Sequence, residues 1–487
     1  MKKYILFITT IAILSVAACR KIETDGRTEV IIVNGGGSGT TGQTITLQGR
    51  ISADTILRKQ NIYILKGLVY MVGNKTMTVE AGTVIKGSFS GADVAALIIS
   101  RGSKLVAEGT PTEPIVFTSA SPNPQSGDWG GIVICGKAPI NTSFNSVAGL
   151  YEVEGGVNNS NGDGLAGSGD AAVPTAIPTD NSGILKYVRI EYAGYAFQPD
   201  KEINSLTMAG VGSGTTIENV QTTYAKDDAF EWFGGTVNCK YLIAYKTQDD
   251  DFDTDNGFSG KVQFGLIIRD SVIADISTSE AFESDNNATG TAATPKTTCI
   301  FSNITAIGPR ATLSNNGNTL FRAGAQIRRN SALSLFNSII IGWPQGVLID
   351  ASSGSPTDLN FNDSSLRMRN VTLAGNTINI KYTVSASAPT GASDASITSF
   401  LTNSFYNNDI LTNATDAKLI QPFNYSAPDP TPFGGSNGNQ KILTGGGFTD
   451  AKFVGDTYFD KTVTFRGGIA PAGILATWWK GWSKFSN

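Results

Sequence analysis

Acidic residues are concentrated in three short stretches of the sequence that align with one another without gaps. The stretches are DAFEWFGG (Asp228–Gly235), DDFDTDNG (Asp250–Gly257) and EAFESDNN (Glu280–Asn287). The second belongs to the run TQDDDFDTDNG, which has five aspartates in eleven residues. Carboxylates at this density can bind a cation, can serve as an acid and a base in catalysis, or can form a solvated acidic ridge.

The alignment predicts columns of equivalent residues if the three stretches lie on neighbouring coils of one fold. One column is aromatic and is most simply an inward stack: Phe230, Phe252 and Phe282. Strand alternation then turns the next column outward: Glu231, Asp253 and Glu283. Buried carboxylates without partners are costly, so we expect a turn that leaves a third column on a corner: Asp228, Asp250 and Glu280. A fourth column contains Asp255 and Asp285.

The spacing of the outward carboxylates favours a cation. Equivalent residues on adjacent coils lie roughly 4.8 Å apart. Two carboxylates at that distance repel each other by roughly 3 kcal/mol at an effective dielectric near 20, and by under about 1 kcal/mol in bulk water. A partly shielded face therefore needs a cation, whereas a solvated ridge does not, and both interpretations stay open. Only oxygen ligands are offered, which suits calcium. The predicted calcium ligands are Glu231, Asp251, Asp253, Asp255, Glu283 and Asp285.

The chain contains no histidine, which excludes a Ser-His-Asp or Cys-His nucleophile system and a His-ligated zinc. Glycan hydrolysis could still use paired carboxylates, which occur in KDD (Lys226–Asp228) and QDDD (Gln248–Asp251). A polysaccharide lyase would need a basic residue, for which Lys226, Lys246 and Arg269 are the candidates. Carboxylate pairs without a placed substrate are weak signs of catalysis, so we favour a non-catalytic role.

The elements that must position these residues recur along the chain. A six-residue pattern occurs seven times in the sequence. It consists of an apolar residue, two variable residues, a Val, Leu or Ile, another variable residue, and a small or apolar residue. Short strands with a minimum period near 22 residues and insertions of variable length are typical of an all-β fold, the parallel β-helix. The central residues of the seven repeats are Val188, Val220, Leu242, Leu266, Ile304, Ile339 and Val371.

Three consecutive stretches carry a more specific likeness. They are YILKGLVYMVGNKTMTVEAGTVIKG (Tyr63–Gly87), IISRGSKLVAEGTPTEPIVFTSA (Ile98–Ala120) and GDWGGIVICGKAPIN (Gly127–Asn141). Through them the chain resembles a family of secreted or lipid-anchored bacterial β-helix proteins, common on outer membranes of Bacteroidota-type bacteria. The resemblance covers most of the chain beyond Gln48. It implies a right-handed parallel β-helix and says little about activity.

The N-terminus has the pattern of a bacterial lipoprotein signal. A basic MKK precedes an apolar run that ends at SVAAC, so residues 1–18 are predicted to be removed and Cys19 to be lipidated. The alternative is an ordinary secretory leader with a chance cysteine. Residues 19–47, which include NGGGSGTTG, are predicted to be a flexible tether. The predicted location is the bacterial outer membrane, facing the cell surface or the periplasm.

The predicted β-helix spans residues 48–394, and residues 395–487 are predicted to form the last coils and a C-terminal cap. Ala395–Asp409 has the pattern of a short helix within this cap. Three tryptophans occur in TWWKGWSKFSN (Thr477–Asn487). We expect them to close the open end of the solenoid, because every solenoid needs a cap, whereas an aromatic patch for a sugar is the alternative.

The composition limits the kinds of partner that this protein can bind. The formal net charge is −4, which argues against nucleic acid as a partner because nucleic-acid affinity rests on cationic contacts. The remaining cysteines each lie in an apolar run and are predicted to be buried free thiols: Cys135, Cys239 and Cys299. The best-supported role is a surface binding or scaffold module for a glycan or a partner protein. The alternative is a polysaccharide lyase or glycoside hydrolase.

Overall fold

The computed structural model describes most of the chain beyond the predicted tether. The described residues are 30–32, 42–197, 202–310, 312–314, 317–386 and 389–486. The predicted signal peptide and Cys19 lie outside them. No helix among the described residues is long and apolar enough to cross a membrane.

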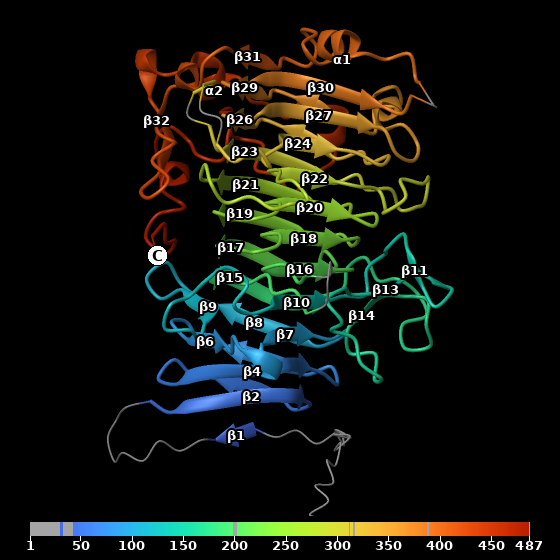
Figure 1. Cartoon of the computed structure of the whole chain (residues 1–487), viewed down its shortest axis with the longest axis vertical. Helices are drawn as coiled ribbons and strands as arrows, with labels where there is room; N and C mark the ends of the chain where they lie inside the picture. The colour runs from blue at the N-terminus through green and yellow to red at the C-terminus, as the bar shows by residue number, and fades with distance from the viewer. Residues whose placement is uncertain are drawn as a thin grey trace, which may run out of the picture.

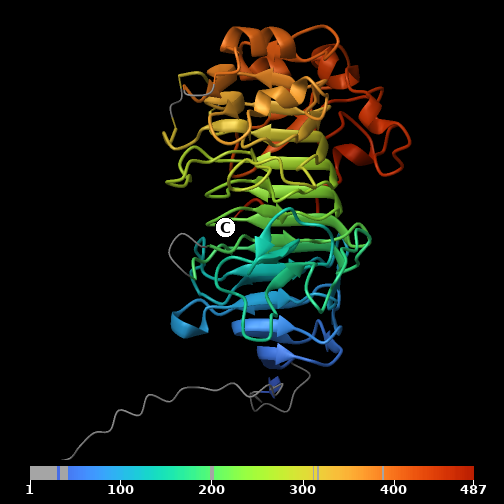
Figure 2. The same ribbon diagram turned by 90° about the vertical axis from the view of Figure 1, so that its right-hand side faces the viewer.

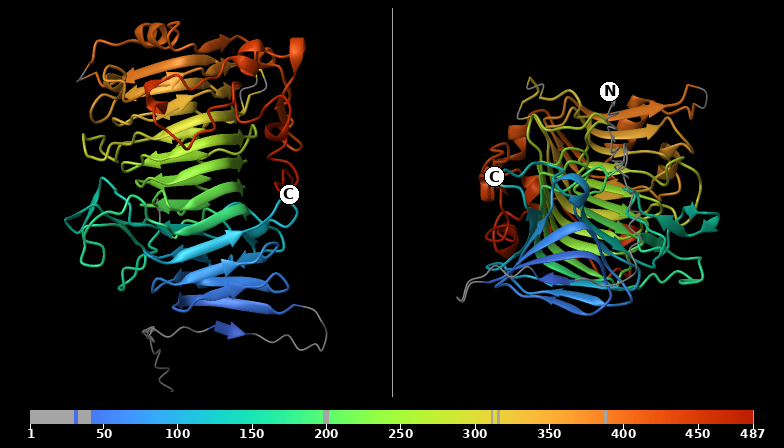
Figure 3. Two further views of the ribbon diagram at one scale, coloured as in Figure 1. Left: turned by 180° about the vertical axis from the view of Figure 1, so that it is seen from behind. Right: turned by 60° about the horizontal axis from the view of Figure 1, so that its bottom comes forward.

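The strands pair side by side into one 27-stranded sheet that winds around a continuous apolar core (Figure 1). Seen from nearer the N-terminal end, the strands surround this core (Figure 3, right). Apart from β1 (Val30–Ile32), which pairs antiparallel with β2 (Thr44–Ile51), the strands of this sheet pair in parallel. The prediction of an all-β parallel β-helix is confirmed.

Each coil contributes strands to three columns, which we call faces A, B and C. Strand β4 (Ile62–Met71) and β2 span faces A and B. The other strands of face B are β7 (Ala96–Ile99), β10 (Gly131–Cys135), β16 (Leu206–Ala209), β18 (Phe230–Phe233), β20 (Phe252–Asp255), β22 (Phe282–Ser284), β24 (Ala323–Ile327), β27 (Gln345–Ala351) and β30 (Ile378–Val384).

Five long strands bend at a corner and contribute their first half to face C and their second half to face A. They are β15 (Gly183–Glu191), β17 (Thr216–Thr223), β19 (Asn238–Tyr245), β21 (Lys261–Ile268) and β23 (Ile300–Ile307). Face A also contains β6 (Val84–Gly87), β9 (Ile115–Ser119), β26 (Ile339–Ile341), β29 (Thr372–Ala374) and β31 (Asp409–Leu411). Face C also contains β3 (Thr55–Leu57), β5 (Thr76–Val79), β8 (Lys104–Glu108), β25 (Ser334–Phe336) and β28 (Met368–Arg369).

One residue with left-handed backbone turns the chain from face C to face A in each of seven coils: Tyr187, Asn219, Tyr241, Phe264, Asn303, Asn337 and Asn370. The predicted repeat positions directly follow these corners except at Leu266 and Ile339, where the prediction is wrong by one residue. Gly265 pairs with Leu242 and Ile304, and Ile339 pairs with Thr305. A Cβ atom on Gly265 would lie 2.7 Å from Ile304 Cδ1. The core at this position therefore needs a small residue, which the apolar sequence pattern does not reveal.

A lobe inserted after β10 lies beside face B (Figure 2). Its short strands are β11 (Ser143–Phe144), β12 (Val147–Ala148), β13 (Leu150–Glu152) and β14 (Leu165–Gly167). The lobe packs on the outer side of face B, where the rings of Tyr151 and Phe233 are 4.8 Å apart. Most of the Gly-, Asn- and Asp-rich stretch Glu154–Gly183 belongs to this lobe. The lobe therefore shields part of face B from solvent.

Helix α1 (Asp394–Leu401) lies over the C-terminal end of the solenoid and places Ile397 and Leu401 in the core (Figure 1). The helix predicted within Ala395–Asp409 is confirmed. The chain then runs back along the outside of faces A and C as a C-terminal segment, residues 412–486 (Figure 3, left). This segment contains β32 (Leu419–Gln421), β33 (Asp429–Pro432) and α2 (Gln440–Thr444).

The three tryptophans do not close the end of the solenoid, so their predicted place is wrong. Trp478, Trp479 and Trp482 belong to a buried cluster with outward side chains of face A, including Ile243 and Leu266. These apolar outward positions need a cover, and the C-terminal segment supplies it. The predicted free thiols are confirmed, because Cys135, Cys239 and Cys299 are buried and unpaired.

Candidate acidic site on face B

Three neighbouring strands of face B, β18, β20 and β22, position the acidic residues. Their register pairs Phe230 with Phe252 and Phe252 with Phe282, and all three rings are fully buried. Successive ring centroids lie 5.6 and 5.5 Å apart. The predicted inward aromatic stack is confirmed. Because the three phenylalanines point into the core, the residue that follows each of them points outward. Glu231, Asp253 and Glu283 therefore form the predicted outward column.

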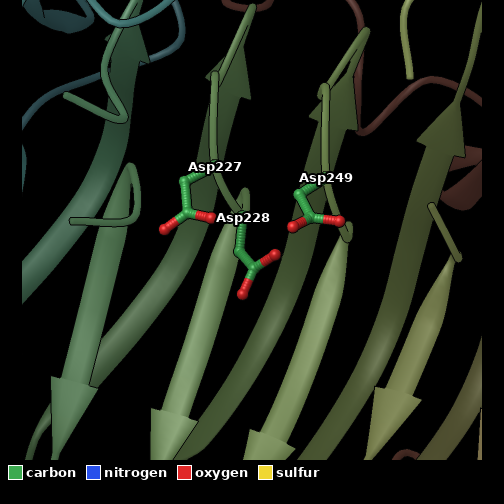
Figure 4. A group of neighbouring side chains, drawn as sticks. All are labelled: Asp227, Asp228 and Asp249. Carbon is green, nitrogen blue, oxygen red and sulfur yellow. The ribbon is translucent and has the colours of Figure 1, made fainter. Parts of the chain in front are cut away.

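The carboxyl groups gather into three groups, of which the first two share Asp228. In each group, one oxygen from every member lies within 4.8 Å of the others. The groups are Asp227, Asp228 and Asp249; Asp228, Glu231 and Asp253; and Asp250, Glu280 and Glu283. Figure 4 shows the first group, whose side chains come from the turns that precede β18 and β20. We call the eight residues of these groups the acidic site.

The corner column is more buried than expected. Asp228, Asp250 and Glu280 do lie at the turns before the strands, but they are only 7%, 5% and 1% exposed. Backbone donors from the next coil take the place of water. The amide of Asp250 donates to Asp228 Oδ1 at 2.9 Å, and the amide of Glu280 donates to Asp250 Oδ1 at 2.6 Å. The stacking of coils therefore builds this column of carboxylates into the fold.

Only some of the carboxylate oxygens in the outward column have a hydrogen-bond or ion-pair partner. Asn204 donates a short hydrogen bond to Glu231, and Arg328 pairs with Glu283. Asp253 lies between Glu231 and Glu283, and its Oδ1 atom is buried without a hydrogen-bond partner among the described residues. A buried charged oxygen without a partner is costly. This atom marks the place in the acidic site where a cation is most needed.

Besides Glu283, two of the predicted calcium ligands pair with arginines, namely Asp251 and Asp285. Asp251 and Arg269 are both fully buried and form an ion pair at 2.8 Å. Asp285 pairs with Arg328 at 2.9 Å and with Arg329 at 2.7 Å. The structure therefore brings Glu231, Asp253 and Glu283 together in the acidic site and separates Asp251 from it. Asp255 lies in the neighbouring outward column with Asp285.

Some members of the acidic site and its counter-ions were missed at the level of sequence. Five of its eight members were not predicted to be ligands: Asp227, Asp228, Asp249, Asp250 and Glu280. Ser284 pairs with Ile327 of the next coil. The residue after Ile327, which is Arg328, therefore lies beside Asp285 and occupies the equivalent position one coil further on. Extending the alignment by one more coil would have found this arginine.

Burial and mutual repulsion raise the pKa values of the acidic site. Burial is the largest cause at Asp228, Glu231, Asp250 and Asp253, and neighbouring carboxylates add to it, so their pKa values lie well above the ordinary range. The same cause raises the pKa of Asp249 to about 7. Without a cation, the acidic site therefore keeps protons at a pH where exposed carboxyls have lost them.

The donor set fits a hard divalent cation. Calcium binds oxygen ligands at about 2.3–2.6 Å, so two oxygens on one ion are at most about 5 Å apart. The carboxylate oxygens of Asp228, Glu231 and Asp253 meet that limit, since they lie within 4.8 Å of one another. These three residues would hold the ion, and the unpartnered Oδ1 atom of Asp253 would gain a ligand bond.

The profile of a protein family described as "Pectate-lyase like beta helix domain" matches residues 49–419. The chain belongs to this family. The acidic site lies entirely inside the matched region of the pectate-lyase-like domain, and so do all strands of faces A, B and C beyond β2. The predicted resemblance to Bacteroidota-type lipoproteins stays a prediction.

No curated protein matches the chain in a sequence comparison. Among solved structures, the A-module of the mannuronan C-5 epimerase AlgE6 from Azotobacter vinelandii aligns with it at 11% identity. The alignment covers 70% of this chain and 81% of the epimerase chain, with a TM-score of 0.25. At that score the likeness carries no argument about function.

The raised pKa values predict how stability of the metal-free pectate-lyase-like domain depends on pH. The folded pKa of Asp249 is about 7, whereas an unfolded aspartate has a pKa of about 3.9. The folded state therefore binds more protons than the unfolded state between these values, and stability falls as pH rises through that window. In chelator, the unfolding midpoint in urea should be higher at pH 5 than at pH 7. A midpoint that rises over this interval would contradict the charge state derived for the acidic site.

Proposed function

We propose that this protein is a binding module of the bacterial cell envelope that holds calcium at the acidic site and uses it to bind an acidic glycan. The buried, unpartnered Oδ1 atom of Asp253, which lies beside two further carboxylates, is the observation that carries this proposal. Membership of the pectate-lyase-like family supports a role with carbohydrate. The solvated-ridge interpretation is disfavoured because four of these eight residues are buried and the other four are partly buried.

Calcium links the acidic site to a ligand through its coordination number. The ion takes six to eight oxygen ligands. One oxygen from each of Asp228, Glu231 and Asp253 supplies three ligands, so positions remain for water or for ligand oxygens. Carboxylate and hydroxyl oxygens of an acidic sugar suit those positions. Without the ion, the acidic site would repel the same ligand.

The binding test uses an unesterified galacturonate oligomer as the probe and isothermal titration calorimetry as the measurement. Binding should require calcium and should be abolished by chelator. Asp253→Asn should weaken calcium-dependent binding by about tenfold or more, since a charged ligand in a buried site is worth about 1.5–3 kcal/mol. Glu108→Gln, at an exposed carboxylate on β8, is the matched control and should bind as the wild type does. Calcium-independent binding that Asp253→Asn leaves intact would refute the proposed role of the acidic site.

The envelope location rests on the predicted lipid anchor at Cys19. Cys19→Ala should move the protein from the membrane fraction to the soluble fraction, because lipid attachment is expected to hold it there. The measurement is immunoblotting of both fractions after a high-salt wash. Retention of the variant in the membrane pellet would show that another contact holds the protein.

Glycoside hydrolysis is a second candidate, favoured by the raised pKa values of Asp228 and Glu231. A carboxylic acid that is protonated near neutral pH beside an ionised partner is what a glycosidase needs. Asp228→Asn should then abolish release of reducing ends from a polysaccharide. The lyase alternative loses one of its candidate bases, because Arg269 is fully buried and paired with Asp251. Another candidate base of the lyase alternative, Lys246, has its ammonium group over the rings of Tyr224 and Tyr245.

A further inference from the structure

A pocket of about 590 Å³ lies on the outer side of face A, at the level of β6, β9 and β15. This is a different face from the one that carries the acidic site. The loop of residues 121–125 forms one wall, and Lys484 of the C-terminal segment closes another. In Figure 1 the end of the C-terminal segment reaches the level of β9 and β15. The volume is in the range of small-molecule sites.

The loop wall of the pocket is preformed. Asp128 Oδ2 accepts hydrogen bonds from Ser119 Oγ at 2.6 Å and from the amide of Gln125 at 3.1 Å. The amide of Ser121 donates to Ser119 Oγ at 2.9 Å. The amide of Asp128 in turn donates to the carbonyl oxygen of Tyr192 at 3.1 Å, which ties this wall to the corner after β15. A ligand therefore meets a surface that needs little ordering on binding.

The C-terminal wall is held by its backbone, which leaves the Lys484 side chain free to contact a ligand. The side-chain amide of Gln221 donates to the carbonyl oxygen of Lys484 at 2.7 Å and accepts from its amide at 2.8 Å. Arg189 donates to the carbonyl oxygen of Trp482 at 3.1 Å and to the carboxylate of Glu191 at 3.0 Å. Residues 482–484 are thus fixed by side chains of β15 and β17.

The lining combines one aromatic ring with hydroxyl, amide and charged groups. Tyr192 stacks on Tyr224 with centroids 5.5 Å apart and an angle of 5°, and it is only 8% exposed, so its ring forms a fixed part of the pocket floor. The polar groups come from Thr118, Ser119, Ser121, Asn123 and Gln125. Two lysines, Lys86 and Lys484, outnumber the single carboxylate of Glu191, which already accepts from Arg189.

We propose that this pocket binds a short acidic oligosaccharide directly, without a metal ion. Hydroxyl and amide groups match the many hydroxyls of a saccharide, and the two lysines pair with its carboxylates. This inference goes beyond the proposed function, because it concerns another face and a different means of neutralising the ligand. The acidic site needs calcium to hold an acidic sugar, whereas the face A pocket supplies its own cations.

The experiment measures binding of trigalacturonate to the full chain by calorimetry in the presence of chelator, which removes the calcium-dependent contribution of the acidic site. Metal-free binding should be detectable. Lys484→Ala should weaken it by about fivefold, the upper range for one exposed ion pair.

Matched controls separate this pocket from the acidic site and from loss of folding. Lys480→Ala changes a lysine of the same segment that lies over the Trp479 ring and outside the pocket, so binding should be unchanged. Asp253→Asn should leave metal-free binding intact while it reduces calcium-dependent binding. Absence of metal-free binding would overturn the proposal without affecting the proposed function. Equal binding of the fully methyl-esterified trimer would overturn the assignment to an acidic ligand.

Discussion

Replacing Arg269 by alanine should destabilise the fold by about 3–5 kcal/mol, the usual cost of removing one partner from a buried ion pair. The variant leaves Asp251 fully buried without its counter-ion. It also removes the donor to the carbonyl oxygens of Thr247, Asp249 and Glu280. Thr247 and Asp249 lie in the turn that precedes β20, and Glu280 lies in the turn that precedes β22, so the loss is felt where the acidic site is built. Urea unfolding followed by tryptophan fluorescence measures the change.

Two further variants test this explanation. Arg322→Ala removes a more exposed arginine whose nearest Asp350 oxygen is 3.8 Å away, and it should cost under about 1 kcal/mol. The double variant Asp251→Ala with Arg269→Met should regain most of the loss, because apolar replacement of a buried pair is often neutral. Neighbouring coils already have alanine at the position of Asp251, namely Ala229 and Ala281. An unfolding midpoint for Arg269→Ala equal to that of the wild type would refute the buried pair.

Calcium should stabilise the folded protein by about 2.7 kcal/mol at a concentration one hundred times its dissociation constant. The ion would neutralise Asp228, Glu231 and Asp253, whose mutual repulsion and burial otherwise oppose folding. Chelator should lower the melting temperature, and calcium should restore it. Magnesium should restore less, because it demands a tighter octahedral site. Scanning calorimetry at low ionic strength is the measurement, since repulsion is least screened there.

The variant Asp253→Asn distinguishes a specific site from general screening of charge. It should raise the stability of the metal-free protein, because it replaces a carboxyl group whose charged form is opposed by burial and by its acidic neighbours, and it should reduce the gain from calcium. Glu108→Gln should keep the full response to calcium, because this side chain is exposed and lies outside the acidic site. Identical melting curves with and without chelator would refute the proposal that the acidic site binds calcium.

The parallel β-helix, the aromatic stack and the outward acidic column could be predicted from the sequence. Strand alternation and coil period are local properties, so Phe230, Phe252 and Phe282 reveal their common direction by spacing alone. The same logic placed five of the seven repeat positions. It was wrong at Leu266 and Ile339, because the small residues Gly265 and Ser338 occupy the equivalent positions within apolar runs.

The absence of histidine also determined much of the chemistry, because it leaves oxygen atoms as the only ligands for a hard cation and removes the usual general base. The lipid anchor at Cys19 remains a prediction of the sequence. These conclusions depend on residue types, which need no tertiary structure to be read.

Only the tertiary structure decided which carboxylates are left without a counter-ion. Arg269 and Arg328 lie 18 and 43 residues from their partners Asp251 and Asp285. Turns of variable length bring them together, and turn length is not encoded in the strand pattern. The place of the C-terminal tryptophans was decided in the same way, since an apolar segment can cover an end or a flank equally well. Local periodicity therefore sets which way a side chain points, whereas the packing of distant turns and segments sets what it meets.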